Sequence, residues 1–172
     1  YQQKADQLSG TGIRWHFLGQ IQSKKAAAVG RTAAVVHSVD RERLVAGLAR
    51  GAREAGVGLD VLIQVSLADL APTSEASGRG GATPQDVAPL AETIVAEPGL
   101  RLAGVMALPP RTADPAVAFA QIVEIGARLQ REHPEASWVS AGMSHDFPAA
   151  IRAGATHVRI GGALFGERPP VR

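Results

Sequence analysis

Two short segments in the last third of the chain combine small residues with the expected start of a helix. The sequence SAGMSHD occupies residues 140–146, and VRIGGA occupies residues 158–163. Small residues let a backbone approach a ligand closely, and the free N–H groups at a helix start favour an anion. If both segments follow the last strands of a barrel, Ser144, Gly161 and Gly162 would form a phosphate cradle. Tight turns and helix caps use glycine in the same way, so the pattern alone leaves both interpretations open.

Arg159 is a charged residue inside an apolar stretch, between Val158 and Ile160. A buried guanidinium needs a partner. That partner is an acid on a neighbouring strand or a strand-end carbonyl if Arg159 is structural, and taken alone this interpretation is slightly favoured. Next to a phosphate cradle, however, Arg159 is a good candidate for a ligand-binding group.

The histidines of the chain do not suggest a metal site. His16 and His37 lie near the ends of expected strands, where hydrogen-bonded structural histidines are the default expectation, and His133, His145 and His157 are typical of surface or loop positions. There is no cysteine and no His-x-x-x-His spacing, so the sequence predicts no metal ligands.

Composition excludes several classes of protein. The 172 residues are 45% hydrophobic and 20% charged, which is typical of a globular domain. No apolar run approaches the roughly 20 residues that span a bilayer. A net charge of +2 is too small to indicate a nucleic-acid partner, and the lack of cysteine fits a cytoplasmic setting. Ser144, His145 and Asp146 are sequence neighbours, so they cannot form the through-space relay of a catalytic triad.

Short β-branched runs alternate with Ala- and Leu-rich helical stretches along the chain. Several runs are continuously apolar, as strands of a parallel sheet are when both faces are buried. The expected strands are Arg14–Leu18, Ala34–Ser38, Asp60–Val65, Arg101–Ala107, Ser137–Ser140 and His157–Ile160.

Helix boundaries can be predicted between these strands. Asp40 is expected to cap a helix that ends near Gly56, and the Asp114-Pro115 pair is expected to start another one. A shorter helix is expected to end at Gly154.

The alternation of strands and helices predicts an α/β fold with a parallel sheet. A doubly wound nucleotide-binding sheet should have a glycine-rich turn after its first strand, but Leu18 is followed by only one glycine. A (β/α)8 barrel needs eight strands and about 250 residues. The barrel interpretation therefore predicts two further strands upstream of Tyr1.

Six segments, in order, resemble the pyridoxal phosphate homeostasis protein family (the YggS/PROSC type). They are WHFLGQIQSKK (15–25), VVHSVD (35–40), LDVLIQVS (59–66), LRLAGVMALPP (100–110), SAGMSHD (140–146) and THVRIGGALFG (156–166). The resemblance implies a (β/α)8 TIM barrel of the alanine racemase N-terminal type that binds pyridoxal 5′-phosphate (PLP). Residues 1–172 would supply strands three to eight, six of the eight, with no second domain.

The resemblance also implies which residues hold the cofactor. Ser144, Gly161 and Gly162 correspond to the phosphate cradle, and Arg159 corresponds to the arginine that faces the pyridine nitrogen. The barrel mouth would be lined by Met106, His37 and His16. The family usually has Thr or Ser where this chain has Gly162. By the same resemblance, the lysine that forms a Schiff base with the cofactor is expected upstream of residue 1, so no catalytic residue is expected within the chain.

Within this resemblance, three functions are open. The first is a non-catalytic, cytoplasmic PLP-binding protein that takes part in PLP homeostasis, as a monomer or, alternatively, a dimer, without nucleic-acid or membrane partners. The second is a PLP-dependent amino acid racemase on the same barrel. Such racemases use a tyrosine as their second base, and the only tyrosine here is Tyr1. The third is a phosphate-binding barrel with another ligand.

Overall fold

One six-stranded parallel sheet organises the chain, whose computed structural model describes residues 2–8, 10–70 and 80–166. The strands are β1 (His16–Phe17), β2 (Val35–Val39), β3 (Leu59–Val65), β4 (Leu100–Ala107), β5 (Trp138–Met143) and β6 (His157–Arg159). The α-helices are α1 (Gln2–Gln7), α2 (Ala26–Thr32), α3 (Val45–Ala55), α5 (Val87–Val95), α6 (Pro115–Glu132), α7 (Phe147–Ala153) and α8 (Gly162–Phe165). The 3₁₀ helices within these ranges are η1 (Ser23–Lys25), η2 (Glu42–Leu44) and η3 (Ala68–Leu70).

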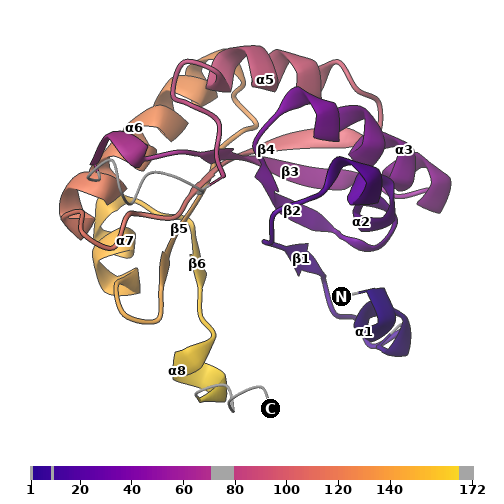
Figure 1. The fold of residues 1–172 in the computed structure, drawn as a ribbon, viewed down its shortest axis with the longest axis horizontal. Helices are drawn as coiled ribbons and strands as arrows, with labels where there is room; N and C mark the ends of the chain where they lie inside the picture. Colours follow the sequence, from indigo (N-terminus) through magenta and orange to yellow (C-terminus); the bar gives the residue numbers. More distant parts are fainter. Residues whose placement is uncertain (1, 9, 71–79, 167–172) are drawn as a thin grey trace.

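The order of the strands decides between the two candidate architectures. In the sheet it is β1-β2-β3-β4-β5-β6, the same as along the chain, and every pairing is parallel. A doubly wound sheet would reverse its strand order at a switch point. Figure 1 shows the sheet curving, with α2, α3, α5, α6 and α7 in an arc along its convex side. This is the strand order and layering of a barrel wall, as predicted.

The two faces of the sheet have apolar layers of very different size. The larger layer lies between the sheet and the helices and includes the fully buried Phe119 of α6. A smaller cluster on the concave face contains Val35, Leu62, Ala103 and Met106. Because both faces are covered, the central strands are mostly apolar in sequence. The six predicted strands are all present, with shifts of a few residues at their ends.

A glycine in β4 changes which side chains of that strand face inward. The register between β3 and β4 shifts beside Gly104, which has a φ of +150°. A Cβ at this position would lie 1.9 Å from the carbonyl oxygen of Trp138 on β5, so no other residue fits without displacing the backbone. The irregularity lets Ala103 and Met106, three positions apart, both join the concave cluster.

Three of the predicted helix boundaries are confirmed. Asp114 accepts a hydrogen bond from the N–H of Ala116 at 2.8 Å and so caps α6. Gly56 and Gly154 follow α3 and α7 with φ values of 67° and 110°, the left-handed conformation that glycine adopts most readily.

The predicted cap at Asp40 is wrong. The turn before α3 is the 3₁₀ helix η2, and its N-cap residue is Arg41, which makes no side-chain cap bond. The carboxylate of Asp40 forms an ion pair with Arg41 instead. Arg41 also donates to the carbonyl oxygen of Ile21 at 2.6 Å, so this pair ties β2 to the segment after β1.

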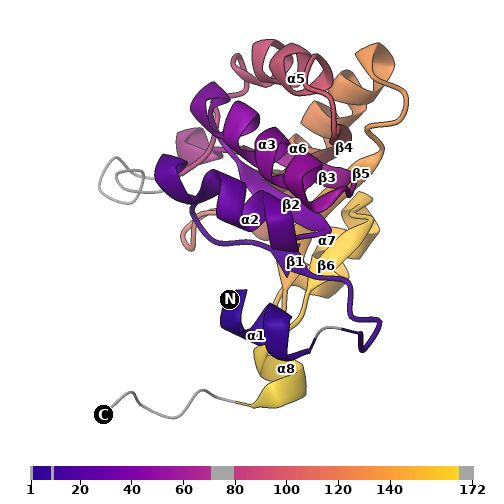
Figure 2. The ribbon, with the colours of Figure 1, turned by 90° about the vertical axis from the view of Figure 1, so that its right-hand side faces the viewer.

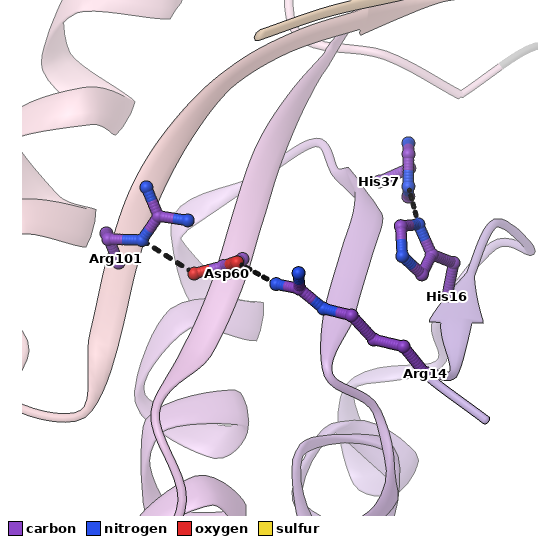
Figure 3. Close-up of polar contacts among 5 residues, drawn as sticks. All are labelled: Arg14, His16, His37, Asp60 and Arg101. Carbon is purple, nitrogen blue, oxygen red and sulfur yellow. Dashed lines mark hydrogen bonds and ion pairs between the residues drawn. The ribbon is translucent and has the colours of Figure 1, made fainter. Parts of the chain in front are cut away.

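An ion-pair cluster lies on the concave face at the amino ends of the strands. The Asp60 carboxylate accepts hydrogen bonds from Arg14 at 2.6 Å and from Arg101 at 2.7 Å, as Figure 3 shows. Both guanidinium groups lie over the ring of Trp138, at 5.9 and 5.4 Å from its centroid. We call Arg14, Asp60, Arg101 and Trp138 the lower cluster. It lies at the end of the sheet opposite the predicted site.

Two kinds of feature are not found within residues 2–8, 10–70 and 80–166. None of the helices there is long and apolar enough to cross a membrane. No group of three or more histidine or carboxylate side chains in the same ranges is placed to hold a metal ion. That the protein needs no metal therefore stays a prediction.

Candidate functional site

A cleft of about 1100 Å³ lies at the carboxyl ends of the strands, where barrel sites are found. Its lining comes mainly from β1, β2, β4, β5 and β6 and from the loops that follow them. All seven residues predicted to contact a cofactor line it: His16, His37, Met106, Ser144, Arg159, Gly161 and Gly162. The fold thus brings together residues that are up to 146 positions apart in the sequence.

Arg159 is held in this cleft by two hydrogen bonds. Its Nη1 donates to the Ser140 hydroxyl oxygen at 2.9 Å, and its Nη2 donates to the carbonyl oxygen of Ala107 at 2.9 Å. The structural partner is thus a strand-end carbonyl rather than an acid. Burial lowers the pKa of Arg159 to about 10, against a smaller opposing effect of Asp146, so the guanidinium is charged at neutral pH. A charged group with unused donors faces the cleft.

Ser144 and the Gly161-Gly162 turn meet on one side of the same cleft. The N–H of Ala163 donates to the Ser144 hydroxyl oxygen at 3.3 Å, which joins the loop after β5 to the start of α8. A Cβ added at Gly161 or Gly162 would meet no heavy atom within 4 Å. The two glycines therefore leave open space beside a hydroxyl group, as a bound anion requires.

The loop that carries Ser144 is shaped by Asp146. Asp146 is the N-cap residue of α7 but makes no side-chain bond to that helix. Its carboxylate instead accepts from the N–H of Met143 at 2.6 Å. Ser144 lies inside this closed turn, which limits how far its hydroxyl can move.

His16 and His37 contact each other at the cleft wall. His16 Nδ1 lies 2.9 Å from His37 Nε2, and His37 Nδ1 lies 3.1 Å from the Ser140 hydroxyl oxygen (Figure 3 shows the first contact). Burial lowers the pKa of His37 to about 3, and the partial burial of the His16 ring also lowers the pKa of His16. His37 is thus a buried, hydrogen-bonded histidine, as the default interpretation expected, whereas His16 is exposed.

Two residues of the site were missed or misplaced by the sequence analysis. The prediction that His157 is a surface or loop residue is wrong. It begins β6, lines the cleft, and its ring lies 4.4 Å from the ring of Trp138. Ser140 was expected only as the end of a strand, but it is fully buried and bonds to both Arg159 and His37. A hydroxyl in an otherwise apolar strand was the available signal.

Comparison with known proteins agrees with this fold. The family described as alanine racemase, N-terminal domain, matches residues 3–169. A pyridoxal phosphate homeostasis protein from Pseudomonas aeruginosa is 40% identical over 166 residues, which cover 96% of this chain and 69% of that protein. The chain belongs to the pyridoxal phosphate homeostasis protein family. The resemblance inferred from six sequence motifs is therefore confirmed.

Further relatives define what part of a family member this chain represents. The pyridoxal phosphate homeostasis protein of Vibrio cholerae serotype O1 is 40% identical over 159 residues, and the match covers 91% of this chain but 65% of the relative. PipY of Synechococcus elongatus PCC7942, solved with PLP bound, superimposes with a TM-score of 0.81 at 30% identity and covers 96% of this chain and 79% of PipY. The chain thus spans about two thirds of the curated relatives, and the six-stranded sheet is part of a barrel of the alanine racemase type.

Proposed function

We propose that this member of the pyridoxal phosphate homeostasis protein family binds PLP in the cleft at the carboxyl ends of the strands, and that it serves PLP homeostasis without catalysing a reaction. One observation carries the proposal. Ser144, the Gly161-Gly162 turn and Arg159 come from the ends of adjacent strands and line the same cleft. Relatives of the chain are named for this role, and PipY was solved with PLP bound.

The charges in the cleft fit an anionic ligand. No acidic residue is among the side chains that line it in the described part of the chain, and Arg159 is positively charged. The histidines His16, His37 and His157 have lowered pKa values and are neutral at pH 7. Hydroxyl, backbone N–H and guanidinium donors are thus not opposed by a carboxylate, which suits a phosphate group.

The proposed roles follow the positions of the residues. Ser144 and the backbone of Gly161 and Gly162 would hold the phosphate. Arg159 would donate to the pyridine nitrogen, with Met106, His37 and His16 as the facing wall. When bound, PLP supplies an aldehyde and an aromatic ring that can accept electrons. A guanidinium facing the ring nitrogen keeps that nitrogen unprotonated, and this weakens the ring as an electron acceptor, which supports a non-catalytic role.

Two other functions differ from this proposal in what they require. A racemase needs a second base on the opposite side of the substrate. The chain contains only Tyr1 as a tyrosine, and that residue lies outside the described ranges. A barrel for some other phosphorylated ligand would need the phosphate cradle but not Arg159.

Three expectations stay predictions. They are the assignment of β1 to β6 as barrel strands three to eight, the cytoplasmic location and the monomeric state.

The decisive experiment is a binding titration of the full-length gene product with PLP, followed by absorption spectroscopy. We expect saturable binding and the absorption band of a lysine-linked cofactor, with pyridoxal, which lacks the phosphate, binding about 100-fold more weakly. If inorganic phosphate alone competed for the site with the same affinity as PLP, the result would favour the barrel with another ligand. Steady racemisation of an amino acid by the purified protein would contradict the non-catalytic role.

Gly162 offers a gain-of-binding prediction. Replacing it with serine should tighten PLP binding about fivefold, because the new hydroxyl would add one hydrogen bond to the phosphate group. The change is sterically free, since a Cβ at Gly162 meets nothing within 4 Å and the residue begins α8 without a positive φ. The same titration gives the measurement.

The matched control is Gly58→Ser. Gly58 also has open space around its added Cβ and no positive φ, but it lies before β3, at the opposite end of the sheet. Its substitution should leave PLP affinity unchanged. If Gly162→Ser fails to tighten binding, or if both variants tighten it equally, the phosphate is not held at this turn.

A further inference from the structure

Four side chains from four strands form a continuous row of hydrogen bonds across the concave face. Arg159 on β6 bonds to the Ser140 hydroxyl oxygen at 2.9 Å, and Ser140 on β5 contacts His37 Nδ1 at 3.1 Å. His37 on β2 then contacts His16 on β1 at 2.9 Å. The middle contact joins residues 103 positions apart and passes over the two strands between β2 and β5.

The direction of every bond in this row follows from Arg159. A guanidinium has only donors, so the oxygen of Ser140 accepts from it. Ser140 is fully buried, and in the described part of the chain the only group next to its hydroxyl that is able to accept its hydrogen is His37 Nδ1. A buried hydroxyl hydrogen without an acceptor is costly, so Ser140 donates to His37.

The same reasoning determines which nitrogen carries the hydrogen in both imidazole rings. His37 accepts at Nδ1, so its neutral ring carries hydrogen at Nε2 and donates to His16 Nδ1. His16 then also carries its hydrogen at Nε2. His16 is exposed and lines the cleft. The last donor of the row, the Nε2–H of His16, is therefore on a residue of the cleft.

The electrostatic surroundings keep both rings neutral, as this arrangement needs. Burial lowers the pKa of His37 to about 3, and repulsion from a protonated His16, from Arg159 and from a protonated His157 would add to the effect. Burial lowers the pKa of His16 as well, together with Arg14 and His157, while Asp60 acts in the opposite direction. A neutral ring is the only form that accepts at one nitrogen and donates at the other.

We propose that Arg159, Ser140, His37 and His16 form a directional hydrogen-bond relay, which positions the Arg159 guanidinium in the cleft and makes the Nε2–H of His16 a donor for the bound ligand. Ser140 and His37 are positioning residues in this relay, because they act through Arg159 and His16. The ligand-binding part rests on the proposed function; the direction of the bonds does not.

The test combines ¹⁵N NMR of the histidine rings with PLP titration, both on the full-length gene product. In the unliganded wild type we expect His16 and His37 as neutral rings with hydrogen at Nε2. Ser140→Ala should leave His37 as a mixture of tautomers and weaken PLP binding about 10-fold, because Arg159 loses one of its two anchors. A His37 ring with hydrogen at Nδ1 in the wild type would overturn the relay without any variant.

Two further variants separate the relay from a general loss of packing. Ser38→Ala removes another buried hydroxyl one position from His37, but that hydroxyl donates to the Gly19 carbonyl oxygen at 2.6 Å, outside the relay. It should change neither the spectra nor the affinity. His37→Gln supplies one acceptor and one donor, so His16 should keep its hydrogen at Nε2 in this variant. His37→Leu supplies neither, so His16 should lose this single tautomer.

The outcomes distinguish the relay from the proposed function. Unchanged histidine spectra in Ser140→Ala, or equal behaviour of His37→Gln and His37→Leu, would contradict the relay. The expected tautomers together with no PLP binding by the wild type would support the relay and contradict the proposed function.

Discussion

Replacing Arg159 with methionine should weaken PLP binding by about 100-fold. The methionine keeps most of the volume of the side chain but removes the guanidinium, and no other arginine or lysine is among the described residues that line the cleft. Hydrogen bonds from a charged donor contribute about 1.5 to 3 kcal/mol, and each 1.4 kcal/mol is a factor of ten in affinity. The loss of the guanidinium therefore accounts for a change of this size.

The protein should remain folded in this variant. Arg159→Met leaves the Ala107 carbonyl oxygen and the Ser140 hydroxyl oxygen without their donor, at a cost of about 2 kcal/mol. Arg159→Lys should bind PLP with intermediate affinity, because a lysine keeps the charge but cannot donate to two groups from a planar fork. Isothermal titration with PLP gives the affinities, and circular dichroism checks the fold.

The control for a simple charge effect is Arg152→Met. Arg152 is an exposed residue in the last turn of α7, on the element that follows the Ser144 loop, and it does not line the cleft. The Arg152→Met variant should bind PLP with the affinity of the wild type. Equal affinity of the Arg159→Met and wild-type proteins would remove Arg159 from the binding site.

The fold was predictable because the information is local. Continuously apolar stretches such as residues 102–107 indicate a strand buried on both faces, and this depends only on the order of residue types. The Asp114-Pro115 pair marks the start of α6 through contacts within one turn. Asp40 shows the limit of this approach. It too has the residue type of a cap, but the neighbouring Arg41 competes for its carboxylate, and only the folded backbone decides between the two.

The cleft was predictable to the extent that its parts are short motifs. The Ser144 loop and the Gly161-Gly162 turn each carry their own pattern of small residues, and the family resemblance supplied Met106, His37 and His16. The connection of Arg159 through Ser140 to His37 was not predictable, because it depends on curvature that brings β2 and β5 within reach across the concave face. Similarly, His157 was misplaced because its ring is covered by Trp138, a contact between two strands.

Replacing Asp60 with asparagine should lower the free energy of unfolding by about 2 kcal/mol. The carboxylate is 11% exposed and holds both Arg14 and Arg101, which lie over the ring of Trp138. Asparagine keeps the shape but leaves two positive charges close together without a counter-charge. Removing one partner of a fully buried ion pair costs about 3 to 5 kcal/mol. The two arginine side chains are 57% and 47% exposed, so water screens part of this cost.

The chain contains a matched control for this prediction. Glu54 also pairs with two arginines, Arg31 at 2.5 Å and Arg50 at 3.7 Å, but its side chain is 44% exposed. Urea denaturation of the full-length gene product should show a loss below about 0.5 kcal/mol for Glu54→Gln. High salt should reduce this small loss but leave most of the Asp60→Asn effect, because a buried charge is screened much less than a surface charge. Equal losses in the two variants would mean that the lower cluster stabilises the sheet no more than a surface ion pair does.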